Sequence, residues 1–223
     1  VYYAIAGTEP STEFDMSDPA EWTKAGWTLA GGTNSWEVPL TGLSEGSRTI
    51  WIRAIDTTYN ISTQLSRVFG VDTAVPALDE TSIGPDTKYT NGNVIFAGFA
   101  SDTNALSSFI VRINGTEETT IAIDVDGPDN VMGSADDNYW TYTFDSTTRV
   151  NKTYTLAFIA KDAANKTTTL SRTVVLDKSI PTIDSVTNIS VSWRSSSTAS
   201  ISGTASDTGS AVQYVKYRIS ADN

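Results

Sequence analysis

Aspartates are the residues best suited to chemistry in this sequence, because the chain contains no histidine and no cysteine. It therefore lacks the commonest general base, the commonest transition-metal ligand, and any disulfide or thiolate site. Carboxylate, hydroxyl and backbone carbonyl oxygens remain, and these are the ligands that hard cations such as calcium prefer. The net charge of −11 also favours cations as partners and argues against binding to nucleic acid.

The densest group of acidic residues lies in the segment IDVDGPDNVMGSADDNYW. Its aspartates are Asp124, Asp126, Asp129, Asp136 and Asp137. The D-x-D-G start is typical of calcium loops, but the EF-hand pattern fails because Pro128 takes its fifth place and Asp129 the place of its glycine. This segment is the weaker of two calcium candidates, and a solvated hairpin loop is the alternative interpretation.

The elements that position these residues belong to an internal repeat with a period of about 105 residues. Residues 53–78 match residues 160–183, and residues 98–113 match residues 203–219. The chain is also longer than one ordinary sandwich domain of about 100 residues. The sequence therefore predicts tandem copies of one domain.

The repeat divides the chain into three parts. Residues 1–73 form a partial domain without its first strands, residues 74–178 a complete domain, and residues 179–223 the first strands of a third domain. The partial domains would expose sheet edges and apolar faces, so we expect neighbouring repeats or neighbouring molecules to complete them. The first residues lack the charged start and apolar core of a signal peptide, which favours an interior piece of a longer array.

Alternating apolar and polar residues, rich in β-branched and aromatic types, predict an all-β fold. In the complete domain the expected strands are 81–90, 94–100, 108–113, 140–144, 153–160 and 168–176. Closely spaced strands without alternating helices are typical of antiparallel sheets packed face to face. The one helix-like window is a single turn, with Ser17 as its N-cap and Pro19 in its first turn.

Three short motifs carry a resemblance to a known family. They are V-D-x-x-x-P at Val71, G-x-A-S-D at Gly98 and Gly203, and A-K-D followed by Asn at Ala160. Together they resemble the bacterial immunoglobulin-like domains, which recur in large adhesins and are similar in shape to fibronectin type III modules. The resemblance covers the whole chain and implies tandem immunoglobulin-like β-sandwiches with a spacer or adhesion role, commonly with calcium at domain junctions.

In such a sandwich three segments lie at one pole: the N-terminal entry, the B–C loop between the expected strands 94–100 and 108–113, and the F–G loop between the expected strands 153–160 and 168–176. This arrangement places Asp72, Asp102 and Asp162 close together, with Asn165 beside them. Converging carboxylates repel one another, and a calcium ion with six to eight oxygen ligands would remove that repulsion. The alternative is that each aspartate only forms a turn by accepting bonds from backbone amides.

The next junction repeats part of this aspartate set. Asp177 and Asp207 stand at the positions of Asp72 and Asp102, but the chain ends before a third F–G loop. The sequence therefore predicts a junction calcium site at Asp72, Asp102, Asp162 and Asn165, and part of one at Asp177 and Asp207.

Tryptophans are the candidate ligand-binding residues. Trp22 and Trp27 lie in a variable acidic loop of the first domain, where they either bind a ligand or pack against the sheet. Trp36 and Trp140 take equivalent places in the repeat, where packing is again the alternative to stacking on a sugar.

The leading functional hypothesis is a stalk or spacer segment of an adhesin on the bacterial cell surface. The alternative is an accessory carbohydrate-binding module of a secreted glycan-degrading enzyme, with Trp22, Trp27 or Trp193 stacking on sugar rings. A host or environmental glycan or protein would then be a partner. We expect no catalysis, because the acidic residues fall in turns and recur with the repeat, and no membrane insertion, because no apolar run approaches the ~20 residues of a spanning helix.

Overall fold

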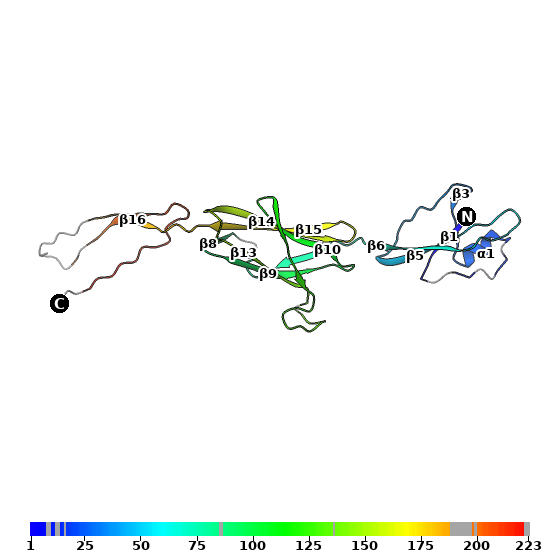
Figure 1. The fold of residues 1–223 in the computed structure, drawn as a ribbon, viewed down its shortest axis with the longest axis horizontal. Coiled ribbons are helices and arrows are strands. Elements are labelled where there is room, and N and C mark those ends of the chain that lie inside the picture. Colours follow the sequence, from blue (N-terminus) through cyan, green and yellow to red (C-terminus); the bar gives the residue numbers. More distant parts are fainter. Residues whose placement is uncertain are drawn as a thin grey trace. The chain divides into compact units, whose positions relative to one another are not determined.

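The computed structural model describes residues 1–223 except 8–9, 12–13, 16, 85–86, 136, 188–197, 199 and 221–223. The chain forms two compact units, which we call the first unit, Val1–Ala74, and the second unit, Val75–Asn223 (Figure 1). The division into three parts at residues 73 and 178 stays a prediction. Among the described residues, no helix has the length and apolar character that crossing a bilayer requires.

The second unit contains a sandwich of two sheets, residues 75–177, which we call the complete sandwich. One sheet has the order β11 (Thr116–Thr120), β10 (Leu106–Ile113), β14 (Lys152–Asp162), β15 (Thr167–Leu176) and β8 (Lys88–Thr90). The other has the order β12 (Ile123–Asp124), β13 (Tyr139–Phe144), β9 (Val94–Ser101) and β7 (Ala77–Glu80). The all-β prediction is confirmed, and five of the six expected strands lie within two residues of the observed bounds.

The expected first strand, 81–90, is wrong. The structure divides this part of the chain into β7, which pairs antiparallel with β9, and β8, which pairs parallel with β15 in the opposite sheet. Between them the chain turns at Ser82 and Ile83, whose backbone N–H groups donate to the carboxylate of Glu80. The turn lets one segment contribute an edge strand to both sheets, which a single alternation pattern does not predict.

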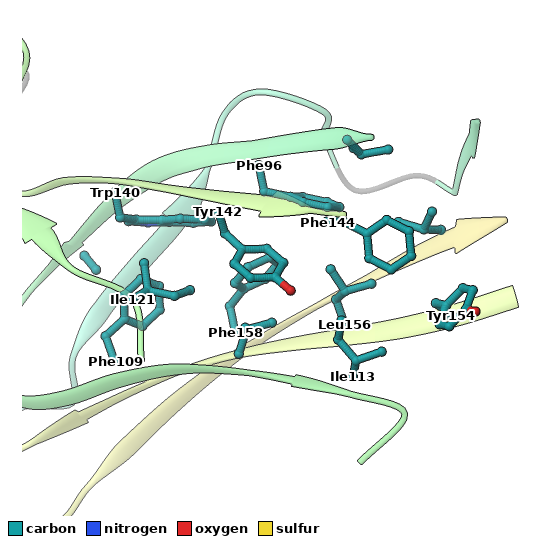
Figure 2. Close-up of a cluster of buried hydrophobic side chains, with 14 of the residues drawn as sticks. Phe96, Phe109, Ile113, Ile121, Trp140, Tyr142, Phe144, Tyr154, Leu156 and Phe158 are labelled. Atoms are coloured by element: carbon teal, nitrogen blue, oxygen red, sulfur yellow. The ribbon is translucent and has the colours of Figure 1, made fainter. Parts of the chain in front are cut away.

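Inward-facing residues of both sheets form one hydrophobic core. Along β14, alternate residues face this core, and Leu156, Phe158 and Ala160 are 0% exposed. Figure 2 shows side chains of the two sheets pointing toward one another, with Phe158 close to Phe96 and Trp140. Ring centroids of Phe158 lie 5.3 Å from Phe96 and 4.9 Å from Trp140, so aromatic packing joins the sheets at the centre.

A buried ion pair joins the two sheets, between β15 of one and the edge strand β7 of the other. The Nε of Arg172 on β15 lies 2.8 Å from Oε2 of Glu80 on β7, and the Glu80 side chain is 0% exposed. Burial opposes ionisation of this carboxyl, but hydrogen bonds from Ser82, Arg172 and Ile83 outweigh it and lower the pKa of Glu80. The carboxylate is therefore retained in its charged form in the folded protein.

The lowered pKa of Glu80 makes its contribution to stability depend on pH. This contribution is complete above the unfolded carboxyl pKa of about 4.3 and is lost as the pH falls through the lower folded value. We expect Glu80→Gln to reduce the free energy of unfolding by about 1.5–3 kcal/mol at neutral pH, with the difference from wild type shrinking below about pH 4. Urea unfolding at several pH values measures this, with the exposed Glu37→Gln as the control. A pH-independent difference would contradict it.

The first unit contains one four-stranded antiparallel sheet in the order β2, β1, β5, β6. Its elements are β1 (Tyr2–Ile5), α1 (Pro19–Lys24), β2 (Thr28–Leu29), β3 (Gly31–Gly32), β4 (Trp36–Glu37), β5 (Gly46–Arg53) and β6 (Leu65–Val71). The N-cap of α1 is Asp18, whose Oδ1 accepts from the backbone N–H of Ala20, and not Ser17 as the sequence suggested. Pro19 follows at the first helical position, as expected.

The second unit also contains a two-stranded pair, β16 (Thr182–Val186) and β17 (Gly203–Ser206). Thr182 pairs with Ser206 here as Ala77 pairs with Ser101 between β7 and β9, so the pairing recurs with the period of the sequence repeat. In both pairs a glycine lets the strands approach, because a Cβ at Gly203 would collide with a backbone carbonyl of the partner strand. The repeat therefore extends to the backbone register of the first two residue pairs, after which β16 has a register shift between Ile183 and Ser185 that β7 lacks.

Candidate cation site

Two loops of the complete sandwich bring aspartates together. Asp102 follows β9, and Asp162 is the last residue of β14. The hydroxyl of Ser107 donates to the backbone oxygen of Asp162 at 2.6 Å, which ties the start of β10 to the end of β14. This bond fixes the B–C loop beside the F–G loop, at the pole where β7 begins.

Two carboxylates at this pole, those of Asp102 and Asp162, each have a buried oxygen without a hydrogen-bond partner. One oxygen of Asp102 lies within 4.8 Å of one oxygen of Asp162, and the place of Asp72 as a third ligand stays a prediction. Asp162 is 0% exposed. Its Oδ1 accepts from the backbone N–H of Lys166 at 2.8 Å, and its Oδ2 is buried without a hydrogen-bond partner. Asp102 repeats this arrangement, because Oδ1 accepts from Asn104 and Oδ2 is buried and unpartnered.

Asp56 shows what an aspartate does when it only forms a turn. It holds the equivalent place after β5 in the first unit, and its carboxylate accepts four bonds of 2.8 Å from Thr58 and Asn60. The bonds from Asn60, followed by those from Thr58, lower the pKa of Asp56 to about 2. In Asp162 only Oδ1 accepts a hydrogen bond within the turn, and Oδ2 is buried without a hydrogen-bond partner. The turn interpretation therefore accounts for Asp56 but only for half of Asp162.

Asn165 lies in the F–G turn, and its backbone helps to shape that turn. Its backbone lies in the left-handed region with φ of 70°, and its N–H donates to the backbone oxygen of Asp162. Its side chain is exposed. The structure thus gives Asn165 a role in shaping the loop that presents Asp162, and its place as a ligand stays a prediction.

At the next junction the aspartates meet protein donors. A Cβ at Gly209 would collide with the Asp177 carboxylate, so Asp177 lies against the loop that contains Asp207. Hydrogen bonds from Ser210 and Ser179 lower the pKa of Asp177, and Asn151 Nδ2 also donates to its Oδ1 at 3.1 Å. Asp207 Oδ1 in turn accepts from the backbone of Gly209 and Ser210. The structure brings the predicted pair together, with its charge partly satisfied by neighbouring hydroxyl and amide groups.

The acidic loop between β12 and β13 projects away from the two sheets (Figure 1). Asp129 and Asp137 accept from backbone groups within the loop, at Val131 and Gly133 respectively. Asp124 is exposed on β12, and Asp126 has one buried oxygen without a partner. Among the described residues, no three carboxylates of this loop come together as they do at Asp162. Asp136 lies outside the described residues, and calcium binding here stays a prediction.

The proposed ligand-binding tryptophans of the first unit are buried. Trp22 is 0% and Trp27 1% exposed, and their ring centroids are 5.6 Å apart in an edge-to-face arrangement. Tyr2 stacks on Trp22 at 4.5 Å, and Trp27 Nε1 donates to the backbone oxygen of Ser11. Neither indole offers a face to a sugar, so the packing interpretation is right for both. Trp193 lies outside the described residues.

A contact that the sequence interpretation missed holds each linker backbone. Asn151, which immediately precedes β14, accepts from the backbone N–H of Lys178 through Oδ1 at 3.0 Å. Glu45, which immediately precedes β5, accepts from the backbone N–H of Thr73 at 2.9 Å. We call each contact a linker clamp. Aligning β5 with β14 would have placed Glu45 and Asn151 together, but their different side chains concealed the shared role.

Comparisons with known proteins find similarity in structure only. No family model and no curated protein matches the sequence. The fibronectin(III)-like modules of Clostridium thermocellum CbhA are similar, with 15% identity, a TM-score of 0.34, and coverage of 65% of this chain and 69% of that chain.

Two further solved structures are similar over part of their own lengths. The Ig1-2 module of the Drosophila receptor protein tyrosine phosphatase DLAR has 12% identity, a TM-score of 0.33, and coverage of 51% of this chain and 57% of that chain. The Bacteroides ovatus mixed-linkage glucan utilization locus SGBP-B, in complex with a mixed-linkage heptasaccharide, has 15% identity, a TM-score of 0.24, and coverage of 85% and 42%.

Proposed function

We propose that this chain is a spacer segment of tandem immunoglobulin-like domains in a bacterial cell-surface protein, and that calcium binds where the linker enters the complete sandwich. The observation that best supports a bound cation is the Asp162 side chain, a fully buried carboxylate that has an unpartnered oxygen and lies beside Asp102. A buried carboxylate that lacks a counter-charge is strongly unfavourable, so such groups are paired or bind metal.

The spacing of the oxygens suits calcium. Oxygens that share one calcium ion at 2.3–2.6 Å lie at most about 4.6–5.2 Å apart. The carboxylate oxygens of Asp102 and Asp162 meet this limit, because they lie within 4.8 Å of each other. Water and backbone carbonyl oxygens supply the remaining ligands in sites of this kind.

The bound ion would act on the linker. We further propose that Asp72, which lies between the end of β6 and Pro76, supplies a third ligand, so that the ion would attach the linker to two loops of the complete sandwich. Pro76 and Pro181 each fix their own φ and restrict the preceding residue, which limits bending of the chain. A stiff series of such domains would hold a terminal domain away from the cell. The accessory carbohydrate-binding alternative has less support, because Trp22 and Trp27 are buried.

Thermal unfolding in the presence of calcium and in the presence of a chelator tests whether calcium binds. We expect calcium to raise the melting temperature of the second unit, because a ligand at 100 times its Kd adds about 2.7 kcal/mol of stability. Asp162→Asn should abolish this increase, because it removes the charge of the buried oxygen. The matched control is Asp56→Asn, which changes the equivalent aspartate of the first unit and should leave the calcium effect intact.

Two outcomes would reject the calcium proposal. One is a melting curve that is the same in calcium and in chelator. The other is a calcium effect that persists in Asp162→Asn, which would place the ion elsewhere, with the acidic loop at Asp126 and Asp129 as the next site to test. Magnesium at the same concentration shows whether the effect needs the larger ion.

A further inference from the structure

The linker between the two units, residues 72–76, is attached to the first unit at Thr73. The backbone N–H of Thr73 donates to Oε1 and Oε2 of Glu45 at 3.1 and 2.9 Å, and its hydroxyl donates to Oε2 at 2.5 Å. Glu45 is itself held, because Nη2 of Arg48 donates to its backbone oxygen at 2.7 Å. Hydrogen bonds to a carboxylate are stronger than those between neutral groups, so this linker clamp fixes Thr73 to the start of β5.

The same linker is attached to the second unit at Pro76. The hydroxyl of Thr168 on β15 donates to the backbone oxygen of Pro76 at 2.6 Å. Pro76 is buried, its ring fixes its own φ, and the next residue, Ala77, pairs with Ser101 of β9. Pro76 is therefore held by β15 of one sheet and by the start of β7 in the other.

Ala74 and Val75 are the two residues between these attachment points. The chain divides into its compact units between the same two residues. Val75 has a β-branched side chain and precedes a proline, which disfavours the α region for its backbone. Its side chain is 60% exposed, so packing adds little to hold it. Ala74 has neither restriction and can adopt both the helical and the extended regions, so it has the widest choice of backbone conformation in the linker.

The next linker has the same kind of clamp with a different side chain. Asn151 Oδ1 accepts from the backbone N–H of Lys178 at 3.0 Å, and its Nδ2 donates to the hydroxyl of Ser179 at 2.8 Å. An amide thus makes the backbone contact that a carboxylate makes in the first linker. One residue, Ile180, then remains before Pro181. Because the contact recurs with different chemistry, we infer that holding the linker backbone is its role.

We propose that these contacts make the linker a two-residue hinge: bending between the units is confined to Ala74 and Val75, although five residues separate β6 from β7. The clamp extends the rigid part of the first unit to Thr73, and the bond from β15 extends that of the second unit back to Pro76. A shorter flexible segment allows fewer relative orientations, so a series of such domains resists bending. Neither contact uses a carboxylate of the candidate cation site, and the hinge therefore exists with or without calcium.

The distribution of distances between one spin label on each unit, measured in the presence of a chelator, tests the hinge. The chain has no cysteine, so Val68→Cys and Ile95→Cys, at exposed positions of the first and second units, supply the only labelled sites. Ala74→Gly should widen the distribution, because glycine adds backbone freedom at the hinge. Its matched control is Ala77→Gly, the same change within the paired strand β7, which should leave the width unchanged.

Removing either attachment should lengthen the hinge. Glu45→Ala and Thr168→Val should each widen the distance distribution, whereas Glu45→Gln should keep much of the wild-type width, because an amide oxygen holds the second linker in this way. Hydrogen exchange of the Thr73 amide should be about tenfold faster in Glu45→Ala, as expected for a lost bond to a charged group. Exchange should be unchanged in the control Glu37→Ala, at an exposed glutamate of the same unit.

Three results would each overturn the proposal. One is a width that Glu45→Ala and Thr168→Val both leave unchanged; because Thr168→Val changes the second unit, this comparison holds even if Glu45→Ala unfolds the first. Another is an equal width for Ala74→Gly and Ala77→Gly. The third is a wide distribution in chelator that becomes narrow when calcium is added, which would assign the stiffness to the ion. A chain that binds no calcium but shows the expected widths would contradict the calcium proposal and leave the hinge intact.

Discussion

Replacing Phe158 with alanine is expected to destabilise the complete sandwich by about 3–5 kcal/mol, which is a large part of the stability of one domain. Phe158 is 0% exposed and contacts three rings of the opposite sheet, with centroids 5.3 Å from Phe96, 4.9 Å from Trp140 and 5.9 Å from Tyr142 (Figure 2). Alanine would leave a cavity that two β-sheets cannot close without losing strand pairing. Every contact across the centre of the sandwich would weaken.

Hydrogen exchange measures this loss in each unit separately. Amides of β9 and β14 should lose protection in Phe158→Ala, whereas those of β5 and β6 should not, because they belong to the first unit. The matched control is Ile52→Ala at the equivalent position of β5, where the side chain is half-buried and the expected loss is about 1–2 kcal/mol. Equal losses in the two variants would contradict the assignment of Phe158 to a closed core and of Ile52 to a half-buried sheet face.

Gly98→Ala is expected to separate β7 from β9 and to destabilise the complete sandwich by about 3 kcal/mol or more. An added Cβ would collide with the backbone carbonyl of Asp79, and backbone in a paired strand cannot rotate away as a side chain can. Because β7 also carries Glu80, loss of this pairing would disturb the ion pair with Arg172. The effect would thus extend from β7 to β15 in the opposite sheet.

Two other glycine substitutions serve as controls for Gly98→Ala. A Cβ at Gly70 on β6 meets no atom within 4 Å, so Gly70→Ala should change the free energy of unfolding by less than about 1 kcal/mol. Gly203→Ala meets the same kind of collision as Gly98→Ala, but should lower protection only in β16 and β17. Urea unfolding and hydrogen exchange distinguish the three. A Gly98→Ala protein as stable as Gly70→Ala would show that the two strands do not approach as described.

The sequence was sufficient for the strands of the complete sandwich, because each of β9, β10, β13, β14 and β15 buries one face and alternates accordingly. It also placed Asp102 and Asp162 at one pole, because β10 starts just after Asp102 and β14, which runs antiparallel to β10, ends at Asp162. The turn after β7 was not predictable in this way. It depends on Glu80, whose carboxylate accepts both from the following backbone and from Arg172, which is distant in sequence.

The burial of the tryptophans of the first unit also depends on tertiary packing. A loop with two indoles among acidic residues has the composition of a binding site, and no local pattern shows that Trp22 and Trp27 bury each other beneath Tyr2. The same limit applies to Asp162 and Asp56. Both begin similar turns, and only the surroundings of the second carboxylate oxygen distinguish a turn former from a candidate ligand.

The parallel pairing of β8 with β15 has a mechanical consequence for a domain that is pulled from its two ends. The strand pair joins Lys88, Tyr89 and Thr90 to Val174, Val175 and Leu176. Tension entering before β7 and leaving after β15 draws these two parallel strands in opposite directions along their length. Their hydrogen bonds then lie across the pulling direction and must break together rather than one after another, as they would in a hairpin opened from its end. Under stretching, the three-residue contact between β8 and β15 would act as a shear lock, and the rate of its rupture would set how long the domain stays folded.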